Sequence, residues 1–72
     1  MEQHLSQYKI FYEVARCGNI SRAAKELYIS QPAISKAISK LEESLGIKLF
    51  SRNSRGVQLT REGAILFQHV NT

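Results

Sequence analysis

The chain has 72 residues, which is enough for one small domain and too few for two. Its composition, 43% hydrophobic and 22% charged, is that of an ordinary soluble globular protein, and no run of residues approaches the length of a membrane span. The net charge is +4 with a pI near 9.6, and the positive excess lies after residue 46, where Lys48, Arg52, Arg55 and Arg61 precede the first acidic residue, Glu62. Such a cluster is typical of a surface that contacts phosphates.

The single cysteine, Cys17, cannot form an internal disulfide, which fits a reducing compartment. The N-terminus lacks the charged segment followed by an apolar segment that marks a signal peptide, so we expect a cytoplasmic protein. Cys17 is expected to be a small apolar residue at the end of a helix. A reactive thiol is the less favoured alternative, because no motif ties a basic group to it.

A first helix is predicted over residues 5–16, because apolar residues recur there at helical spacing. Gly18 provides the exit from this helix. The residues expected to face the core are Leu5, Tyr8, Phe11, Val14 and Ala15.

A second helix is predicted over residues 21–27, where Ala23, Ala24 and Leu27 recur at helical spacing and the alanines allow another helix to approach closely. Asn19 and Ser21 both suit its N-cap, and the sequence does not distinguish between them. Ile20, between the two candidates, is expected to point inward.

A third helix follows after a connection of only two residues, Tyr28 and Ile29. Ser30 offers a side-chain oxygen to the free N–H groups of the new helix, and Pro32 is tolerated in its first turn. A connection this short holds two helices at a steep angle, as in DNA-reading helix pairs, with Ile29 filling the space between them. The pattern predicts a helix-turn-helix.

The third helix, predicted over residues 31–46, has two different faces. A stripe formed by Ile34, Ile38, Leu41 and Leu45 is expected to enter the core, and Gly46 to end the helix. The other face carries hydrogen-bonding groups without negative charge, and we expect it to contact DNA through Gln31, Ser35, Lys36, Ser39 and Lys40. Glu42 and Glu43 come near the C-terminal end and, being adjacent, point to different sides of the helix. The helix dipole favours acidic residues near the start of a helix and basic residues near its end. The third helix has the reverse order, which costs about a few tenths of a kcal/mol per charge and indicates a partner that offsets this cost.

A two-stranded hairpin is predicted after Gly46, because apolar and polar residues alternate over 47–49 and again over 57–59, around a polar connection, 51–56. A ribbon of this kind behind a DNA-reading helix is called a wing. Arg52 and Arg55 lie near its tip and are expected to reach a phosphate or a minor groove. The alternative is a solvated basic loop. The apolar residues expected to hold the ribbon on the core are Leu49, Phe50, Val57 and Leu59.

Thr60 is expected to cap a last helix with a short apolar edge made by Ile65, Leu66 and Val70.

The chain resembles the DNA-binding domain of LysR-type transcriptional regulators, a bacterial family, from Leu5 to about Phe67. The resemblance includes the SQPAIS sequence at 30–35, and the similar positions outside it are Phe11, Val14, Ala15, Gly18, Ala23, Ala24, Leu27, Leu41, Glu42, Leu45, Gly46, Leu49, Phe50, Arg52, Arg55, Val57, Leu59, Thr60 and Gly63.

This resemblance implies a mainly α fold, a winged helix-turn-helix with three helices, a two-stranded wing and the start of a linker helix. It also implies sequence-specific binding of double-stranded DNA and transcription regulation, with the recognition helix, residues 31–46, in the major groove and the wing arginines on the backbone or in the minor groove. Lys36 stands where arginine is frequent in the family. Lysine lacks the planar guanidinium group with which arginine contacts guanine bidentately, so Lys36 contacts either a base or a phosphate. The residues expected to bind DNA are Ser30, Gln31, Pro32, Ser35, Lys36, Ser39, Lys40, Arg52 and Arg55.

Members of the family resemble one another in having a long linker helix for dimerisation and a larger domain that senses a small molecule. We therefore expect residues 1–59 to form the DNA-binding domain and residues 60–72 to start the linker helix. We expect a homodimer in a longer parent protein, and a small-molecule effector only through a domain that this chain lacks.

Two other classes of function fit the sequence less well than DNA binding. An interaction module that binds an acidic protein or a membrane surface would fit the positive net charge of the chain. The acid-free polar face of the third helix and the lack of an exposed aromatic anchor argue against such a module. An enzyme is disfavoured, because His4 and His69 stand alone near the ends and no Cys/His cluster has metal-ligand spacing. We expect no catalytic residue, cofactor or metal, and no membrane partner.

Overall fold

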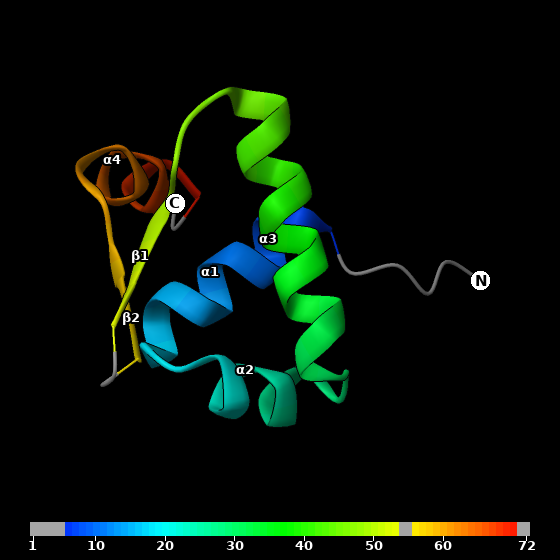
Figure 1. Ribbon diagram of the computed structural model, residues 1–72. Helices are drawn as coiled ribbons and strands as arrows, with labels where there is room; N and C mark the ends of the chain where they lie inside the picture. Colours follow the sequence, from blue (N-terminus) through cyan, green and yellow to red (C-terminus); the bar gives the residue numbers. More distant parts are fainter. Residues whose placement is uncertain (1–5, 54–55, 71–72) are drawn as a thin grey trace.

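The computed structural model describes residues 6–53 and 56–70, and its elements follow the predicted order. They are α1 (Gln7–Cys17), α2 (Ile20–Leu27), α3 (Gln31–Leu45), β1 (Phe50–Asn53), β2 (Gly56–Leu59) and α4 (Arg61–Val70). Helix α1 lies in the middle and contacts α2, α3, α4 and β2, with α3 on one side and the hairpin with α4 on the other (Figure 1). This is the mainly helical, winged helix-turn-helix arrangement that was predicted.

Side-chain caps decide where the first three helices begin. Ser6, Asn19 and Ser30 each accept a hydrogen bond from the backbone N–H three residues further on, at 3.0, 3.0 and 3.2 Å. The cap of α2 is therefore Asn19 and not Ser21, and Ile20, the first residue of the helix, packs against the core as expected. Each cap satisfies an N–H group that has no partner inside its helix.

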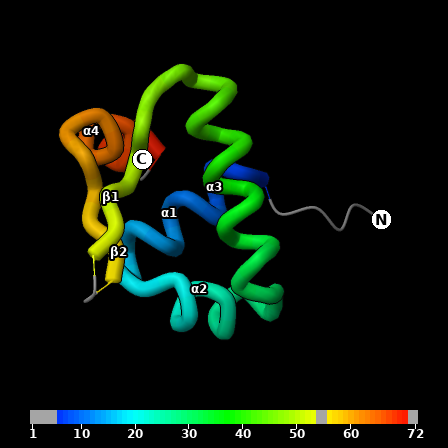
Figure 2. Tube along the Cα trace, in the orientation of Figure 1, coloured from blue at the N-terminus to red at the C-terminus, as the bar shows by residue number. Residues whose placement is uncertain are grey.

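The core is built mainly by α1, α2 and α3 around Leu49. It departs from the predicted core in three places. Ile10, which was not predicted, is buried, whereas Tyr8 is 43% exposed and Leu45 is 39% exposed. Leu45 is the last residue of α3, and this end of the helix extends past α1 (Figure 2). The buried residues are Ile10, Phe11, Val14, Ala23, Ala24, Ile34, Ile38, Leu41 and Leu49. Leu5 lies outside the described residues.

The hairpin is present but shifted relative to the prediction. Phe50 pairs with Leu59 and Asn53 pairs with Gly56, so residues 51–53 belong to β1 and not to the connection. Residues 47–49, predicted as strand, form no ladder. The amides of Ile47 and Leu49 donate to Glu42, and the carbonyl oxygens of Lys48 and Leu49 accept from Thr60. Among them only Leu49 enters the core, while Ile47 is 37% exposed.

Thr60 caps α4 as predicted, since its hydroxyl oxygen accepts a hydrogen bond from the Gly63 amide at 3.0 Å. The apolar edge of α4 is displaced from the predicted one: Ile65 is 54% exposed, whereas Leu66, Phe67 and Val70 pack against the core. Phe67, missed from the sequence, stacks on Tyr12 of α1 with ring centroids 5.2 Å apart. An aromatic contact across two elements has no local sequence signal.

Gly63 is the point where α4 meets the chain entering β1. It is buried, and a Cβ at this position would collide with the carbonyl oxygen of Leu49 and lie 3.0 Å from the Leu59 side chain. No side chain fits unless α4 moves away from the hairpin.

We therefore expect Gly63→Ala to lower the free energy of unfolding by about 1–3 kcal/mol, the range for overpacking a tight contact. Urea unfolding followed by circular dichroism measures this effect. Gly46→Ala is the matched comparison, because Gly46 has a φ of 71° but open space around it. That variant carries only the backbone penalty of about 1–2 kcal/mol. Equal midpoints for Gly63→Ala and the unsubstituted chain would contradict the close contact.

Candidate nucleic-acid interface

The two faces of α3 are separated as the sequence predicted, apart from Leu45. Ile34, Ile38 and Leu41 are buried at 0–4% exposure. Of the residues expected to bind DNA, Ser35 is half-buried and the others on this helix are exposed: Ser30, Gln31, Pro32, Lys36, Ser39 and Lys40. The buried stripe fixes the rotation of the helix, so the polar groups are held at the surface by the core beneath them.

The exposed face of α3 has no acidic residue between Gln31 and Leu41. Within the described part of the chain, neither Lys36 nor Lys40 has an ion-pair partner. Arg16 of α1, by contrast, donates to Glu13 from Nη2 at 2.8 Å, and this hydrogen bond, with the carboxylate charge, raises the pKa of Arg16 above its usual value. The polar face of α3 therefore presents two ammonium groups that no carboxylate of the described residues neutralises.

The turn between α2 and α3 is short and shaped by the backbone. Tyr28 ends α2 in the left-handed region, with a φ of 59°, and the amide of Ile29 donates to the Ala24 carbonyl at 3.1 Å. Ile29 packs against the core, as predicted for a residue between the two helices. The ring of Tyr28 is 94% exposed, an exposed aromatic that the sequence analysis did not anticipate.

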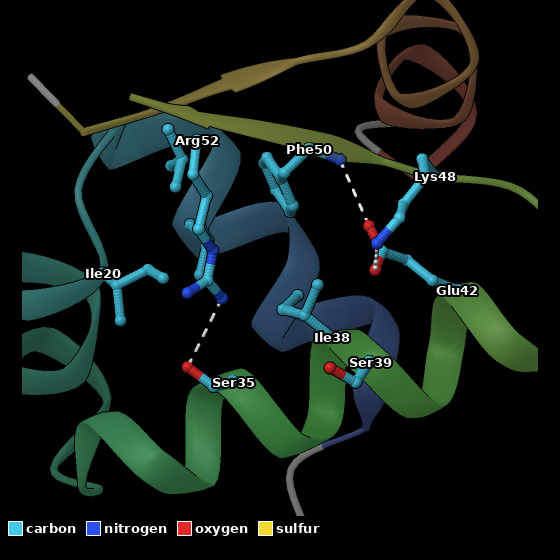
Figure 3. A pocket seen from close by; sticks show the side chains of 10 residues that line it. Ile20, Ser35, Ile38, Ser39, Glu42, Lys48, Phe50 and Arg52 are labelled. Carbon is cyan, nitrogen blue, oxygen red and sulfur yellow. Dashed lines mark hydrogen bonds and ion pairs between the residues drawn. The ribbon is translucent and has the colours of Figure 1, made fainter. Parts of the chain in front are cut away.

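The structure brings Arg52 of the hairpin to α3. Arg52 is exposed on β1, and its Nη2 donates to the Ser35 hydroxyl oxygen at 3.5 Å, across 17 positions of the sequence (Figure 3). Arg55, the other predicted wing arginine, lies outside the described residues. The side chain of Arg52 thus points toward α3 in the structure.

A groove of about 500 Å³ separates α3 from the hairpin (Figure 3). Hydroxyl and charged side chains line its α3 and β1 sides, and apolar side chains of the core form its floor. The lining residues are Val14, Ile20, Ser35, Ile38, Ser39, Glu42, Lys48, Phe50, Arg52 and Val57.

Glu42 anchors the hairpin to α3, a role that the sequence analysis missed. Its Oε2 accepts hydrogen bonds from the backbone amides of Leu49 at 2.8 Å and of Phe50 at 3.3 Å. Its Oε1 lies 3.9 Å from the ammonium of Lys48. The Glu42 side chain is only 14% exposed, while Glu43 is exposed on another side of the helix, as predicted.

In the ranges 6–53 and 56–70, no three His, Cys, Asp or Glu side chains gather where a metal ion could be held. None of the helices in these ranges is both long and apolar enough to cross a membrane. Cys17 is half-buried and packs against the core at the end of α1, as expected.

Comparison with protein families finds a match to the model described as bacterial regulatory helix-turn-helix protein, lysR family, over residues 5–64. The chain is 48% identical over 64 residues to the probable cat1 operon transcriptional activator of Acinetobacter lwoffii, covering 89% of this chain and 21% of that protein. It is 44% identical over 59 residues to the transcriptional regulator PcaQ of Agrobacterium fabrum, covering 82% and 19%. The chain therefore spans about a fifth of the length of these curated relatives.

Solved structures show the same fold. The BenM DBD bound to catB site 1 DNA superposes with a TM-score of 0.89 at 38% identity, over 96% of this chain and 77% of that chain. The CbnR DBD in complex with DNA gives a TM-score of 0.89 at 38% identity, over 96% and 79%.

We expect Glu42→Ala to lower the free energy of unfolding by about 1–3 kcal/mol, because two amides at the base of the hairpin lose their acceptor. Glu42→Gln keeps an acceptor oxygen and should lose less. Chemical denaturation of the three proteins measures both effects. Glu43→Ala is the matched control and should stay within about 0.5 kcal/mol of the unsubstituted chain. A Glu42→Ala variant as stable as this control would refute the anchoring role.

Proposed function

Because the chain belongs to the lysR family of bacterial regulatory helix-turn-helix proteins, we propose that it binds specific sequences of double-stranded DNA and thereby regulates transcription. The observation that carries this proposal is the exposed, acid-free face of α3, which presents an amide, hydroxyls and unpaired ammonium groups on a rigid helix. The DNA complexes formed by the BenM and CbnR domains support it, since this chain shares their fold at 38% identity.

In the proposed complex α3 lies in the major groove, which is wide enough to admit a helix and presents a distinct pattern of donors and acceptors for each base pair. Gln31 is exposed in the first turn, where recognition helices contact base edges, and its amide can pair with an adenine. Ser30, Pro32, Ser35, Ser39 and Lys40 complete the interface on this helix. Arg55 of the wing reaches the backbone or the minor groove.

Lys36 is assigned to a phosphate. It is exposed, it has no ion-pair partner among the described residues, and an ammonium group lacks the fork that lets arginine hold a guanine bidentately. A point charge on a flexible stem is suited to a phosphate oxygen, whose position varies little with sequence.

We further propose that residues 1–59 form the DNA-binding unit and that residues 60–72 begin a linker helix. We also propose a homodimer in a longer parent protein, and a small-molecule effector bound outside residues 1–72. Ile65, 54% exposed on α4, is an apolar group that a partner helix could cover. The protein acts by binding and not by catalysis, in the bacterial cytoplasm where its DNA lies.

Selection of bound duplexes from a random pool tests the main proposal. We expect enrichment of a defined sequence, and in the longer parent two copies of it about one helical turn apart, as a two-fold protein requires. Binding without any sequence preference would favour an electrostatic interaction module instead.

Gln31→Ala should cost about 1–3 kcal/mol on the selected duplex and relax the preference at one base position. Fluorescence anisotropy with single-base-pair variants of the selected site measures both changes. Gln68→Ala, which removes the same side chain from an exposed position on α4, is the control and should leave the profile unchanged. An unaltered base profile for Gln31→Ala would exclude Gln31 from base reading.

Lys36→Ala should weaken binding to the selected duplex and to unrelated duplexes alike. The slope of log K against log salt concentration should become shallower by about 0.9, the value for one lost phosphate contact. Lys36→Arg keeps the charge and should keep the slope. A change of base preference with an unchanged slope would assign Lys36 to a base.

A further inference from the structure

We propose that Glu42 is a positioning residue for DNA recognition: its carboxylate sets the place of the hairpin relative to α3, so that both elements meet a duplex as one rigid unit. This inference rests on the DNA binding proposed above. The Glu42 side chain is 14% exposed and is directed at the backbone of the chain entering β1 (Figure 3). It therefore acts through the hairpin and not by touching DNA.

The carboxylate meets the hairpin at its base. Phe50 begins β1 and pairs with Leu59, the last residue of β2, so this end of the ribbon is where both strands join the rest of the molecule. Glu42 accepts the amides of Leu49 and Phe50 at 2.8 and 3.3 Å. Hydrogen bonds to an ionised acceptor are roughly twice as strong as those between neutral groups. One side chain of α3 thus holds the base of the whole ribbon.

Few other contacts tie the hairpin to α3. Within residues 6–53 and 56–70, no backbone hydrogen bond joins α3 to either strand. A groove of about 500 Å³ lies between the two elements, so the outer part of the hairpin does not pack on α3 directly. The Glu42 carboxylate spans this gap at 2.8 Å from the Leu49 amide, whereas Arg52 and Ser35 are joined by a long contact of 3.5 Å.

The contacts that hold the hairpin elsewhere do not involve α3. At the tip end of the ladder, the Val57 amide donates to the Gly18 carbonyl oxygen at 3.5 Å, and a Cβ on Gly56 would lie 2.8 Å from the same oxygen. At the base, Thr60 ties residues 48 and 49 to the start of α4. We therefore expect the hairpin to pivot relative to α3 when the Glu42 carboxylate is removed, and not to detach from the domain.

The position of the hairpin matters because the duplex fixes the spacing that a protein must match. A helix in the major groove and a ribbon beside it contact sites whose separation is set by the DNA. Glu42 lies on the same helix as Gln31, the residue proposed to read a base, so the hairpin is placed relative to the reading face itself. A hairpin held in advance needs less ordering on binding.

The first experiment measures the position of the hairpin without DNA. Spin labels are attached to cysteines introduced at Ser44 of α3 and Gln58 of β2, both exposed, in a chain that also carries Cys17→Ala. Double electron–electron resonance gives the distribution of distances between the labels. We expect a narrow distribution with Glu42 present, a broader or displaced one for Glu42→Ala, and an intermediate one for Glu42→Gln, which keeps an acceptor oxygen.

Two control variants separate the anchor from charge alone. Glu43→Ala removes the neighbouring carboxylate, which is exposed, and should leave the distribution unchanged. Lys48→Ala removes the ammonium 3.9 Å from Glu42, and because this side chain is 82% exposed, the distribution should again be unchanged. Urea unfolding of each variant gives its folded fraction, and Glu42→Gln decides the question if Glu42→Ala is poorly folded.

The second experiment measures binding of the selected duplex by fluorescence anisotropy, corrected for the folded fraction. Glu42→Ala should lose about tenfold in affinity, the effect of one charge-assisted contact. Its slope of log K against log salt concentration should become shallower by about 0.9 for each phosphate contact of the hairpin that is lost. The base preference should be unchanged, and Glu42→Gln should recover part of the affinity. Removing a negative charge by itself strengthens attraction to DNA, as Glu43→Ala should show, so weaker binding identifies the positioning role.

Three results would overturn the proposal, and they are distinguishable. If Glu42→Ala and Glu43→Ala give the same distance distribution, the carboxylate does not place the hairpin. If the hairpin moves but Glu42→Ala binds the selected duplex as tightly as Glu43→Ala, its position does not matter for recognition. If the unsubstituted chain prefers no duplex sequence, the proposed function fails and the role in recognition fails with it, whatever the labels show.

Discussion

The structure depends on how the short link between α3 and β1 is held. Glu42 accepts the amides of Leu49 and Phe50 from the side of α3, while Thr60 donates its hydroxyl to the Lys48 carbonyl at 2.6 Å from the side of α4. The Thr60 amide also donates to the Leu49 carbonyl at 3.0 Å. Three residues of extended chain are thereby tied to both neighbouring helices. This fixes the distance between the recognition helix and the hairpin, and hence the groove between them.

The same link joins α3 and the hairpin to α4. Leu49 is fully buried among the helices, and its carbonyl lies against Gly63 in the first turn of α4. A change in the direction of α4 would press on this carbonyl and so on the amides held by Glu42. The contact at Gly63 therefore limits how α4 can be oriented relative to the hairpin.

The division of α3 into two faces is what turns a stable fold into a binding surface. Burial of Ile34, Ile38 and Leu41 contributes about 1.5–3 kcal/mol for each side chain, far more than the few tenths of a kcal/mol that the charge order along the helix costs. The core can therefore hold the polar face of α3 at the surface without any bound DNA. A partner meets donors whose positions are already set, so little ordering is needed on binding.

The sequence by itself determined the features that depend on neighbouring residues. Ser30 and Gly46 bound α3, and the helical spacing of its isoleucines predicts which face is buried, because caps and periodicity act within a turn or two of the chain. Tertiary structure decided the features that need a partner from another element. The exposure of Leu45, the anchoring of residues 48–50 by Glu42, and the approach of Arg52 to Ser35 across 17 positions depend on where α3 ends relative to α1 and the hairpin. The periodicity of apolar residues in the sequence does not reveal these contacts, because segments that are distant in the sequence meet only after the chain has packed.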